Sequence, residues 1–374
     1  MGCGTSASSA PTVSVQRRRL SVSDTSGDDA EVGGTDLEED RGLMNLLDAK
    51  TIVEMLDTGG TGDRKMSVGS NTDQAKTSFA QKSMQELGEK LNPSKASIGF
   101  TCRKGLKPES PNQDSWFVLR VEGEKPCSIY AVFDGHGKKG HDVSQFVKEN
   151  LPKLIVKDPR FMTDQMDRML VDCFKKMQSL IASADRMKKI SAQMSGTTCT
   201  IAIHDHSNDK VTVAHVADSS AVLSKGSKGI NITRDHKPNL PDERKRIEAN
   251  GGRVVFDGYA NHRVYAKAAR YPGLNMSRCL GDLMGHSDCG LSCEPEVKVL
   301  ELSADDTALL ICSDGVWEFI TPDEAVGIVS EFEPAKAMAA AERLAKEAWD
   351  RWIREEGGAV VDDITVVYVH LKTK

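Results

Sequence analysis

The sequence predicts an α+β fold in which a central β-sandwich of two antiparallel sheets is flanked by paired helices, a four-layer αββα arrangement. Strand-like runs occur in blocks, long helical patterns separate these blocks, and no internal repeat is present. The chain has 374 residues, of which 39% are hydrophobic, so it can bury a core of this size.

Two long stretches have the apolar spacing of helices that pack one face against a core. Residues 140–157 and 164–190 place large apolar side chains three or four positions apart. Shorter helical patterns lie at 241–251, 322–330 and 334–354.

Runs rich in β-branched residues predict the strands. The first ends at Phe133, and later ones are expected at 297–302, 307–312 and 364–371. Four other runs, separated by turn residues, predict an antiparallel meander at 198–204, 210–217, 221–224 and 229–233. Residues 253–276 form a long irregular stretch that is too polar for a core and too aromatic for a flexible linker.

The first 95 residues differ in composition from the rest. They are rich in Ser, Thr, Gly and acidic residues, which predicts a largely disordered tail before a folded domain at 96–374. Residues 37–56 interrupt this composition with Leu, Ile and Val at mostly helical spacing. An amphipathic helix is expected there, either docked on the folded domain or on a partner, or transient within a linker.

The amino terminus has the pattern of a lipid anchor. Gly2 stands in a myristoylation sequence, Cys3 is a candidate for palmitoylation, and the basic residues 17–19 would add attraction to anionic lipid. We therefore expect a protein tethered at the cytoplasmic face of a membrane and present in the cytoplasm. The alternative is an unmodified flexible terminus. The sequence has no apolar run near the roughly 20 residues that a membrane span needs.

The composition excludes several function classes. The formal charge is −6 and the pI is near 5.9, so the chain is acidic overall and lacks the basic excess that nucleic-acid binding needs. Nucleic acid is therefore not expected as a partner. The nine cysteines are odd in number and contain no C-x-x-C pair, which indicates reduced thiols in a cytosolic setting.

Acidic residues stand beside strands that are far apart in the sequence. Asp134 and Asp314 each follow an apolar run and precede a glycine, and Asp362 stands just before the last strand. If two sheets pack face to face, these positions gather along one rim of the sandwich. Convergent carboxylates repel unless cations bind between them, and oxygen ligands suit Mg²⁺ or Mn²⁺. The pattern indicates a two-metal centre for water attack on a phosphoryl group.

Ten short blocks resemble, in their order, those of the metal-dependent protein phosphatases of the PPM or type 2C family. They include FDGHG, SRCLGD and SDGVW, and the resemblance covers about residues 97–374. The blocks lie at 111–114, 133–137, 195–198, 217–219, 235–238, 251–252, 277–282, 294–296, 313–317 and 362–365.

The resemblance implies a protein serine/threonine phosphatase with two Mn²⁺ or Mg²⁺ ions. Asp134 would bridge the ions, the Gly135 carbonyl would bind one of them, and Asp314 and Asp362 would complete the other. Asp114 would order a metal-bound water.

The family mechanism that this resemblance implies is direct hydrolysis of phosphoserine or phosphothreonine in phosphoprotein substrates. A hydroxide bridging the metals would attack phosphorus in line, and His136 would donate a proton to the leaving alkoxide. No cysteine has an arginine six positions later, so the loop of thiol phosphatases is missing.

We expect a monomer.

The chain departs from the family pattern at the residue that grips the substrate phosphate. Many members have Arg there, whereas Lys107 lies nearest that position, with Arg103 and Lys104 as alternatives. Gln193 and Glu318 replace two acids that contribute to a third metal in the family, which weakens the expectation of a third ion.

Residues 253–276 occupy the place of the variable flap beside the active site. We interpret this flap as the substrate-selecting segment, although its Tyr and Arg side chains can equally serve to pack the flap down. The candidate residues are Tyr259, His262, Arg263, Tyr265 and Arg270.

Two other functions fit part of the sequence. A catalytically dead scaffold would bind phosphoproteins at a membrane, but Asp134, His136, Asp314 and Asp362 are all retained. A two-metal nuclease is disfavoured by the acidic balance of the chain.

Overall fold

The computed structural model describes residues 37–56, 63–72, 82–107 and 111–371. The lipidation candidates Gly2 and Cys3, with the basic residues 17–19, lie outside these residues. Within the described ranges, no helix combines the length and the apolar character needed to cross a membrane.

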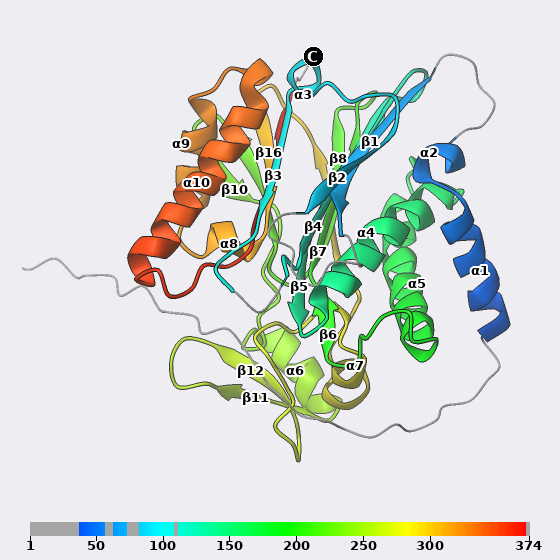
Figure 1. Cartoon of the computed structure of the whole chain (residues 1–374), viewed down its shortest axis with the longest axis vertical. Coiled ribbons are helices and arrows are strands. Elements are labelled where there is room, and N and C mark those ends of the chain that lie inside the picture. Colours follow the sequence, from blue (N-terminus) through cyan, green and yellow to red (C-terminus); the bar gives the residue numbers. More distant parts are fainter. Residues whose placement is uncertain (1–36, 57–62, 73–81, 108–110, 372–374) are drawn as a thin grey trace, which may run out of the picture.

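Two antiparallel sheets pack against each other between two layers of helices (Figure 1). The spatial order in the larger sheet is β15 (Glu296–Glu301), β8 (Lys210–Val216), β7 (Cys199–Asp205), β5 (Cys127–Gly137), β4 (Asp114–Glu122), β1 (Arg64–Asn71) and β2 (Ser83–Gly88). Off this path, β6 (Ser195–Thr197) pairs with β5, and β14 (Leu280–Gly281) pairs with β6. The five-stranded sheet has the order β10 (Lys228–Asn231), β9 (Ser220–Lys225), β16 (Asp306–Cys312), β17 (Ile364–His370) and β3 (Ile98–Arg103).

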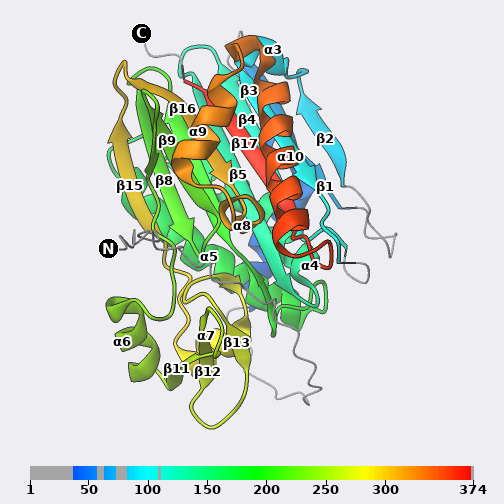
Figure 2. The same ribbon diagram turned by 90° about the vertical axis from the view of Figure 1, so that its left-hand side faces the viewer.

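Helices cover the outer face of each sheet. α4 (Gly140–Lys157) and α5 (Met166–Arg186) pack on the larger sheet, and α9 (Pro322–Ser330) and α10 (Ala337–Glu355) pack on the five-stranded sheet (Figures 1 and 2). Shorter helices are α3 (Pro93–Ala96), α8 (Asp314–Trp317) and η1 (Pro334–Lys336). Apolar cores fill the space between the sheets and beneath both helix layers. The predicted αββα class and the predicted helices are confirmed.

The predicted four-strand meander is wrong in its sheet assignment. β7 and β8 pair in the larger sheet, whereas β9 and β10 pair in the other one. The chain changes sheets just after Ala217, whose φ of 76° lies in the left-handed region. Strands of both sheets have buried inner faces, so alternation along the sequence identifies a strand without showing which sheet it joins.

The predicted disordered tail through residue 95 is also wrong for its described part. β1 pairs with β4 and β2 pairs with β1, which extends the larger sheet. Met66 and Val68 of β1 are buried between the sheets. This strand was not predicted because it carries only two large apolar residues, and the rest are charged, polar or glycine.

The expected helix at 37–56 consists of two helices docked on the folded domain. α1 (Leu37–Ala49) and α2 (Ile52–Met55) bury Met44, Leu47 and Ile52 in the core that includes α4 and α5. Asp40 of α1 accepts a hydrogen bond of 2.8 Å from Ser183 of α5. Of the alternatives that the sequence left open, the structure shows the helices packed on the chain's own folded domain.

The stretch 253–276, expected to be irregular, contains a small three-stranded sheet. It consists of β11 (Gly252–Phe256), β12 (His262–Ala266) and β13 (Pro272–Leu274). With α6 (Pro241–Ala249) and α7 (Leu283–Cys289), it forms a lobe at one end of the sandwich (Figure 2). Val254, Val264 and Leu274 give this lobe its own apolar core.

Candidate active site

Two predicted site residues face each other across neighbouring strands. Asp114 begins β4, Asp134 lies near the end of β5, and antiparallel pairing sets the two directly opposite. β5 is buried along almost its whole length up to Asp134, because its Val, Tyr and Phe side chains fill the cores on both faces. The strand thus fixes the backbone that carries Asp134 and the following Gly135.

The other two predicted aspartates come from the five-stranded sheet. Asp314 begins α8 directly after β16, and Asp362 precedes β17, which pairs with β16. Ser313 links the two sheets, since its Oγ donates a hydrogen bond of 2.8 Å to Asp114 Oδ2. The negative charges of Asp314 and Asp362 act on Asp134, so four carboxylates share one rim of the sandwich.

The electrostatics of this rim favour bound cations. Burial, followed by the charges of its acidic neighbours, raises the pKa of Asp134 well above its usual value. Burial and the charge of Asp363 raise the pKa of Asp114 to about 7. Asp114 Oδ1 is buried and has no hydrogen-bond partner within the described part of the chain. A set of crowded carboxylate oxygens with an unused buried acceptor fits hard divalent cations and their waters.

The adjacent acids Asp362 and Asp363 have different surroundings. Asp363 accepts backbone hydrogen bonds from Gly105 (2.8 Å) and Gln113 (2.7 Å), one on each carboxylate oxygen. Asp362 Oδ1 accepts from Lys107 Nζ and from the Asp363 amide. Asp363 therefore fastens two loops, while Asp362 faces the charged groups of the rim.

The structure separates the three candidate phosphate-binding bases. Lys107 forms an ion pair with Asp362, whereas the Arg103 guanidinium stacks 3.7 Å from the ring centroid of Trp349. Lys104 Nζ donates to the Lys107 carbonyl (2.9 Å) and so supports the loop. Burial lowers the pKa of Lys107, but the charges of Asp362, Asp363 and Asp134 together with the hydrogen bond to Asp362 outweigh it, and the net pKa is raised. Of the three bases, Lys107 is the cation at the carboxylate rim.

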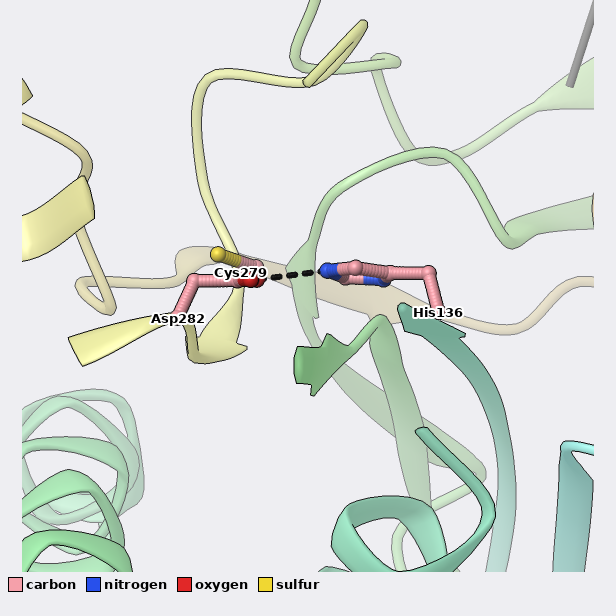
Figure 3. A group of neighbouring side chains, drawn as sticks. All are labelled: His136, Cys279 and Asp282. Atoms are coloured by element: carbon pink, nitrogen blue, oxygen red, sulfur yellow. Dashed lines mark hydrogen bonds and ion pairs between the residues drawn. The ribbon is translucent and has the colours of Figure 1, made fainter. Parts of the chain in front are cut away.

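His136 is held by an acid that the sequence did not assign. His136 Nε2 lies 2.5 Å from Asp282 Oδ2, and Asp282 is buried at the start of α7 (Figure 3). Burial lowers the pKa of His136, but the charge and hydrogen bond of Asp282 outweigh it, so the pKa is raised. His136 Nδ1 is buried without a hydrogen-bond partner among the described residues.

Gly196 of β6 leaves the space in which His136 and Asp282 meet. It pairs with His136 on one side and with Gly281 on the other. A Cβ on Gly196 would lie 2.1 Å from Asp282 Oδ2 and 2.8 Å from His136 Nε2. Only glycine fits between these two side chains.

The sequence contained a partial signal for Asp282. A histidine that transfers protons needs a partner that fixes its ring, and a carboxylate is the usual one. Asp282 lies in one of the ten blocks, but it is 146 residues from His136. At such a separation, several acids in the blocks were equally plausible partners for His136. Only the pairing of β5, β6 and β14 shows that Asp282 is the partner.

The two residues that depart from the family pattern for a third metal, Gln193 and Glu318, have defined positions. Gln193 Nε2 donates a hydrogen bond of 2.6 Å to Asp185, which also accepts from the Ala192 amide. Glu318 directly follows α8, and its amide donates to the Asp314 carbonyl.

The candidate flap residues fall into two groups. Arg263 is buried, pairs with Asp257 at 3.1 Å and donates to the Gly273 carbonyl. The guanidinium carbon of Arg253 lies over the Tyr265 ring, 5.4 Å from the ring centroid. Arg263 and Tyr265 therefore serve the packing of the lobe.

The remaining three flap residues are more accessible. Tyr259 is 65% exposed near the turn between β11 and β12, and Arg270 is exposed between β12 and β13. His262 packs its ring against Phe256, with centroids 5.1 Å apart. Tyr259 and Arg270 are thus the flap side chains best placed to meet another molecule.

Comparisons with known proteins agree with this arrangement. A family model described as protein phosphatase 2C matches residues 105–356. "Probable protein phosphatase 2C 34" of Arabidopsis thaliana is 33% identical over 71% of this chain and 78% of its own length. "Probable protein phosphatase 2C 48" of Oryza sativa subsp. japonica is 33% identical over 68% of this chain and 79% of its own length.

A solved structure gives the same result for the fold. The serine-threonine phosphatase 2C from Toxoplasma gondii is similar to this chain with a TM-score of 0.62 and 21% identity, covering 74% of this chain and 94% of that one. The sequence match, the fold and the arrangement of the rim agree, and the chain belongs to the protein phosphatase 2C family of metal-dependent serine/threonine protein phosphatases.

Proposed function

We propose that this protein is catalytically active and hydrolyses phosphoserine or phosphothreonine in proteins at the carboxylate rim. The observation that carries the proposal is the convergence of Asp114, Asp134, Asp314 and Asp362 from two sheets, beside the His136–Asp282 pair. A scaffold that only bound phosphoproteins would have no use for a buried proton donor with its own orienting acid.

The donor set suits Mn²⁺ or Mg²⁺, and the proposed ligands are Asp134, the Gly135 carbonyl, Asp314 and Asp362. When bound, two such cations supply Lewis acidity and an activated water at neutral pH. Two ions are proposed, and Gln193 weighs against a third because it is a neutral amide where relatives have a carboxylate.

The protein's own groups bind the phosphate and supply the proton. Lys107 carries a positive charge at the rim and attracts the phosphate dianion as a point charge. Asp114, fixed by Ser313, keeps Oδ1 for a water. His136, protonated at both nitrogens, donates the Nδ1 proton to the leaving serine or threonine oxygen, while Asp282 stabilises the imidazolium at Nε2.

Further proposals concern location and substrate choice. Membrane tethering is proposed from Gly2, Cys3 and the basic residues 17–19, and a Gly2→Ala protein that stays on membranes would contradict it. Tyr259 and Arg270 are proposed to contact the protein substrate around the phosphorylated residue. The proposed state is a monomer.

A turnover assay separates the enzyme from the scaffold. The full chain is incubated with a phosphothreonine peptide in Mn²⁺, in Mg²⁺ and in excess EDTA, and phosphate release is measured. We expect many turnovers with either cation and none in EDTA. Peptide binding without phosphate release in Mn²⁺ would contradict the proposed activity.

A further inference from the structure

Cys279 adds a third ligand-type side chain to the His136–Asp282 pair. One ligand atom from each of these three residues lies within 4.8 Å of the others. Figure 3 shows the three side chains converging from separate segments: His136 from β5, Cys279 from the segment just before β14, and Asp282 from the start of α7. Among the described residues, no three carboxylates of the rim come this close together.

The cluster is mostly buried, and solvent reaches it only at His136. Cys279 and Asp282 are buried, whereas the His136 side chain retains 17% exposure. His286 Nε2 lies 3.8 Å from Cys279 Sγ and donates to the Cys279 carbonyl at 3.2 Å, which holds the segment that carries the thiol. An ion can therefore reach the cluster past the imidazole ring.

The ligand types distinguish this cluster from the rim. Thiolate and imidazole are soft or borderline ligands that select Zn²⁺, whereas carboxylates, carbonyls and water suit Mg²⁺ and Mn²⁺. Zinc takes Zn–S distances of about 2.3 Å and Zn–N distances of about 2.0–2.1 Å. Ligand atoms within 4.8 Å of one another reach these distances through side-chain rotation.

We propose that His136, Cys279 and Asp282 form a Zn²⁺ site, separate from the carboxylate rim, and that zinc bound there inhibits the phosphatase. Three protein ligands leave the fourth tetrahedral position to a water. The binding part of the proposal stands alone, whereas the inhibitory part rests on the proposed function.

Zinc binding at His136 Nε2 would convert the proton donor into a neutral imidazole. The thiol proton of Cys279 and the Nε2 proton of the His136 imidazolium pass to solvent, and Zn–S, Zn–N and Zn–O bonds form in their place. The proton left on Nδ1 then belongs to a neutral ring, which is a much weaker acid than the imidazolium. Burial, with the charge of Asp282, raises the pKa of the Cys279 thiol, so the metal has to displace a proton that the free protein keeps. Chelation of the zinc reverses these steps and restores the donor.

The binding test uses Co²⁺ as a spectroscopic substitute for zinc. The full chain is saturated with Mg²⁺ to fill the rim and then titrated with Co²⁺, and thiolate-to-cobalt charge transfer is followed in the near ultraviolet. We expect a band that Zn²⁺ abolishes at one equivalent. It should be absent from Cys279→Ser and present in the control Cys289→Ser, which alters another buried thiol. A missing wild-type band, or one that survives Cys279→Ser, would overturn the site.

The inhibition test uses the same three proteins. In saturating Mn²⁺, the Zn²⁺ concentration that halves phosphate release should rise by roughly tenfold or more in Cys279→Ser and stay unchanged in Cys289→Ser. Equal inhibition of all three proteins, relieved by extra Mn²⁺, would place the zinc at the rim and overturn the inhibitory role. If the wild type showed no turnover, the cobalt band would still decide the binding part.

Discussion

His136 Nε2 lies 2.5 Å from Asp282 Oδ2, and the two residues are brought together by the pairing of three short strand segments. Asp282 is almost wholly buried, so its charge acts on the imidazole with little screening by solvent. The net effect is a raised pKa for His136, which keeps the proton on the ring at higher pH.

Asp282→Asn tests this effect through the pH dependence of turnover. The substitution keeps the shape of the side chain and removes its charge, so the pKa of His136 should fall. Because the donor then loses its proton at lower pH, the alkaline limb of the kcat–pH profile should move to lower pH. For a phosphothreonine peptide, kcat at alkaline pH should drop by up to about 100-fold.

A matched substrate controls for structural damage by Asp282→Asn. p-Nitrophenyl phosphate has a good leaving group and needs little proton donation, so its turnover should fall much less than that of the peptide. An unchanged alkaline limb, or an equal loss with both substrates, would contradict the role of Asp282 in orienting and charging His136.

Gly196→Ala should damage the same pair by crowding. The new Cβ would meet Asp282 Oδ2 at 2.1 Å and the Leu280 carbonyl at 2.7 Å. We expect peptide turnover to fall more than roughly tenfold and stability to fall by about 1–3 kcal/mol, as overpacking of close contacts does. Gly327→Ala is the control, because no atom lies within 4 Å of its added Cβ in α9. That change should leave turnover intact and stabilise the helix by up to about 1 kcal/mol.

The free energy of unfolding should depend on pH differently with and without bound cations. Without cations, Asp114 has a folded-state pKa of about 7 against an ordinary value of 3.8, so the folded protein binds more protons than the unfolded chain between these values. This carboxyl therefore lowers the free energy of unfolding as pH rises from about 4 to 7. Mn²⁺ should oppose that loss.

Thermal unfolding measures this linkage. The increase in Tm that Mn²⁺ gives over EDTA should be small at pH 5 and larger at pH 7.5. Asp134→Asn removes a carboxyl whose own pKa is raised by burial and by the charge of Asp114, so it should reduce the pH dependence seen in EDTA. A Tm increase independent of pH would contradict cation binding at the carboxylate rim.

Leu47→Ala tests whether the docked helix α1 is part of the stable domain. Leu47 is buried in the core shared with α5, and Lys153 donates a hydrogen bond to its carbonyl. Its truncation should cost about 2–5 kcal/mol in the free energy of unfolding, measured with urea. Asn45→Ala, at an exposed position of the same helix, should change stability by less than about 0.5 kcal/mol. Equal, negligible effects of both substitutions would mean that α1 is not held on the domain.

The sequence predicted local elements better than their assembly. The helix at 140–157 was located to the residue, because apolar side chains at helical spacing need only local information. Sheet membership depends on partners far along the chain, so β9 was assigned to the same meander as β8, although it pairs with β16 instead. β1 was missed because its stability comes from pairing with β4, and its own composition is mostly polar.

The same distinction applies to the active site. Asp134 and Asp314 were identifiable because each ends an apolar run at a glycine, a local signal that the family resemblance reinforced. Asp282 and Gly196 act only through packing between segments that are distant in sequence, and neither has a local signal for that role.

The most direct test of the account is Mn²⁺-dependent hydrolysis of a phosphothreonine peptide by Asp134→Asn. Asp134 stands at the centre of the repelling carboxylates, so its loss should leave a folded protein whose Tm in EDTA is at least that of the wild type. We predict that this variant loses the Mn²⁺-induced increase in Tm and more than about 100-fold of the peptide turnover. Wild-type turnover by Asp134→Asn in Mn²⁺ would contradict a metal-dependent phosphatase site at this rim.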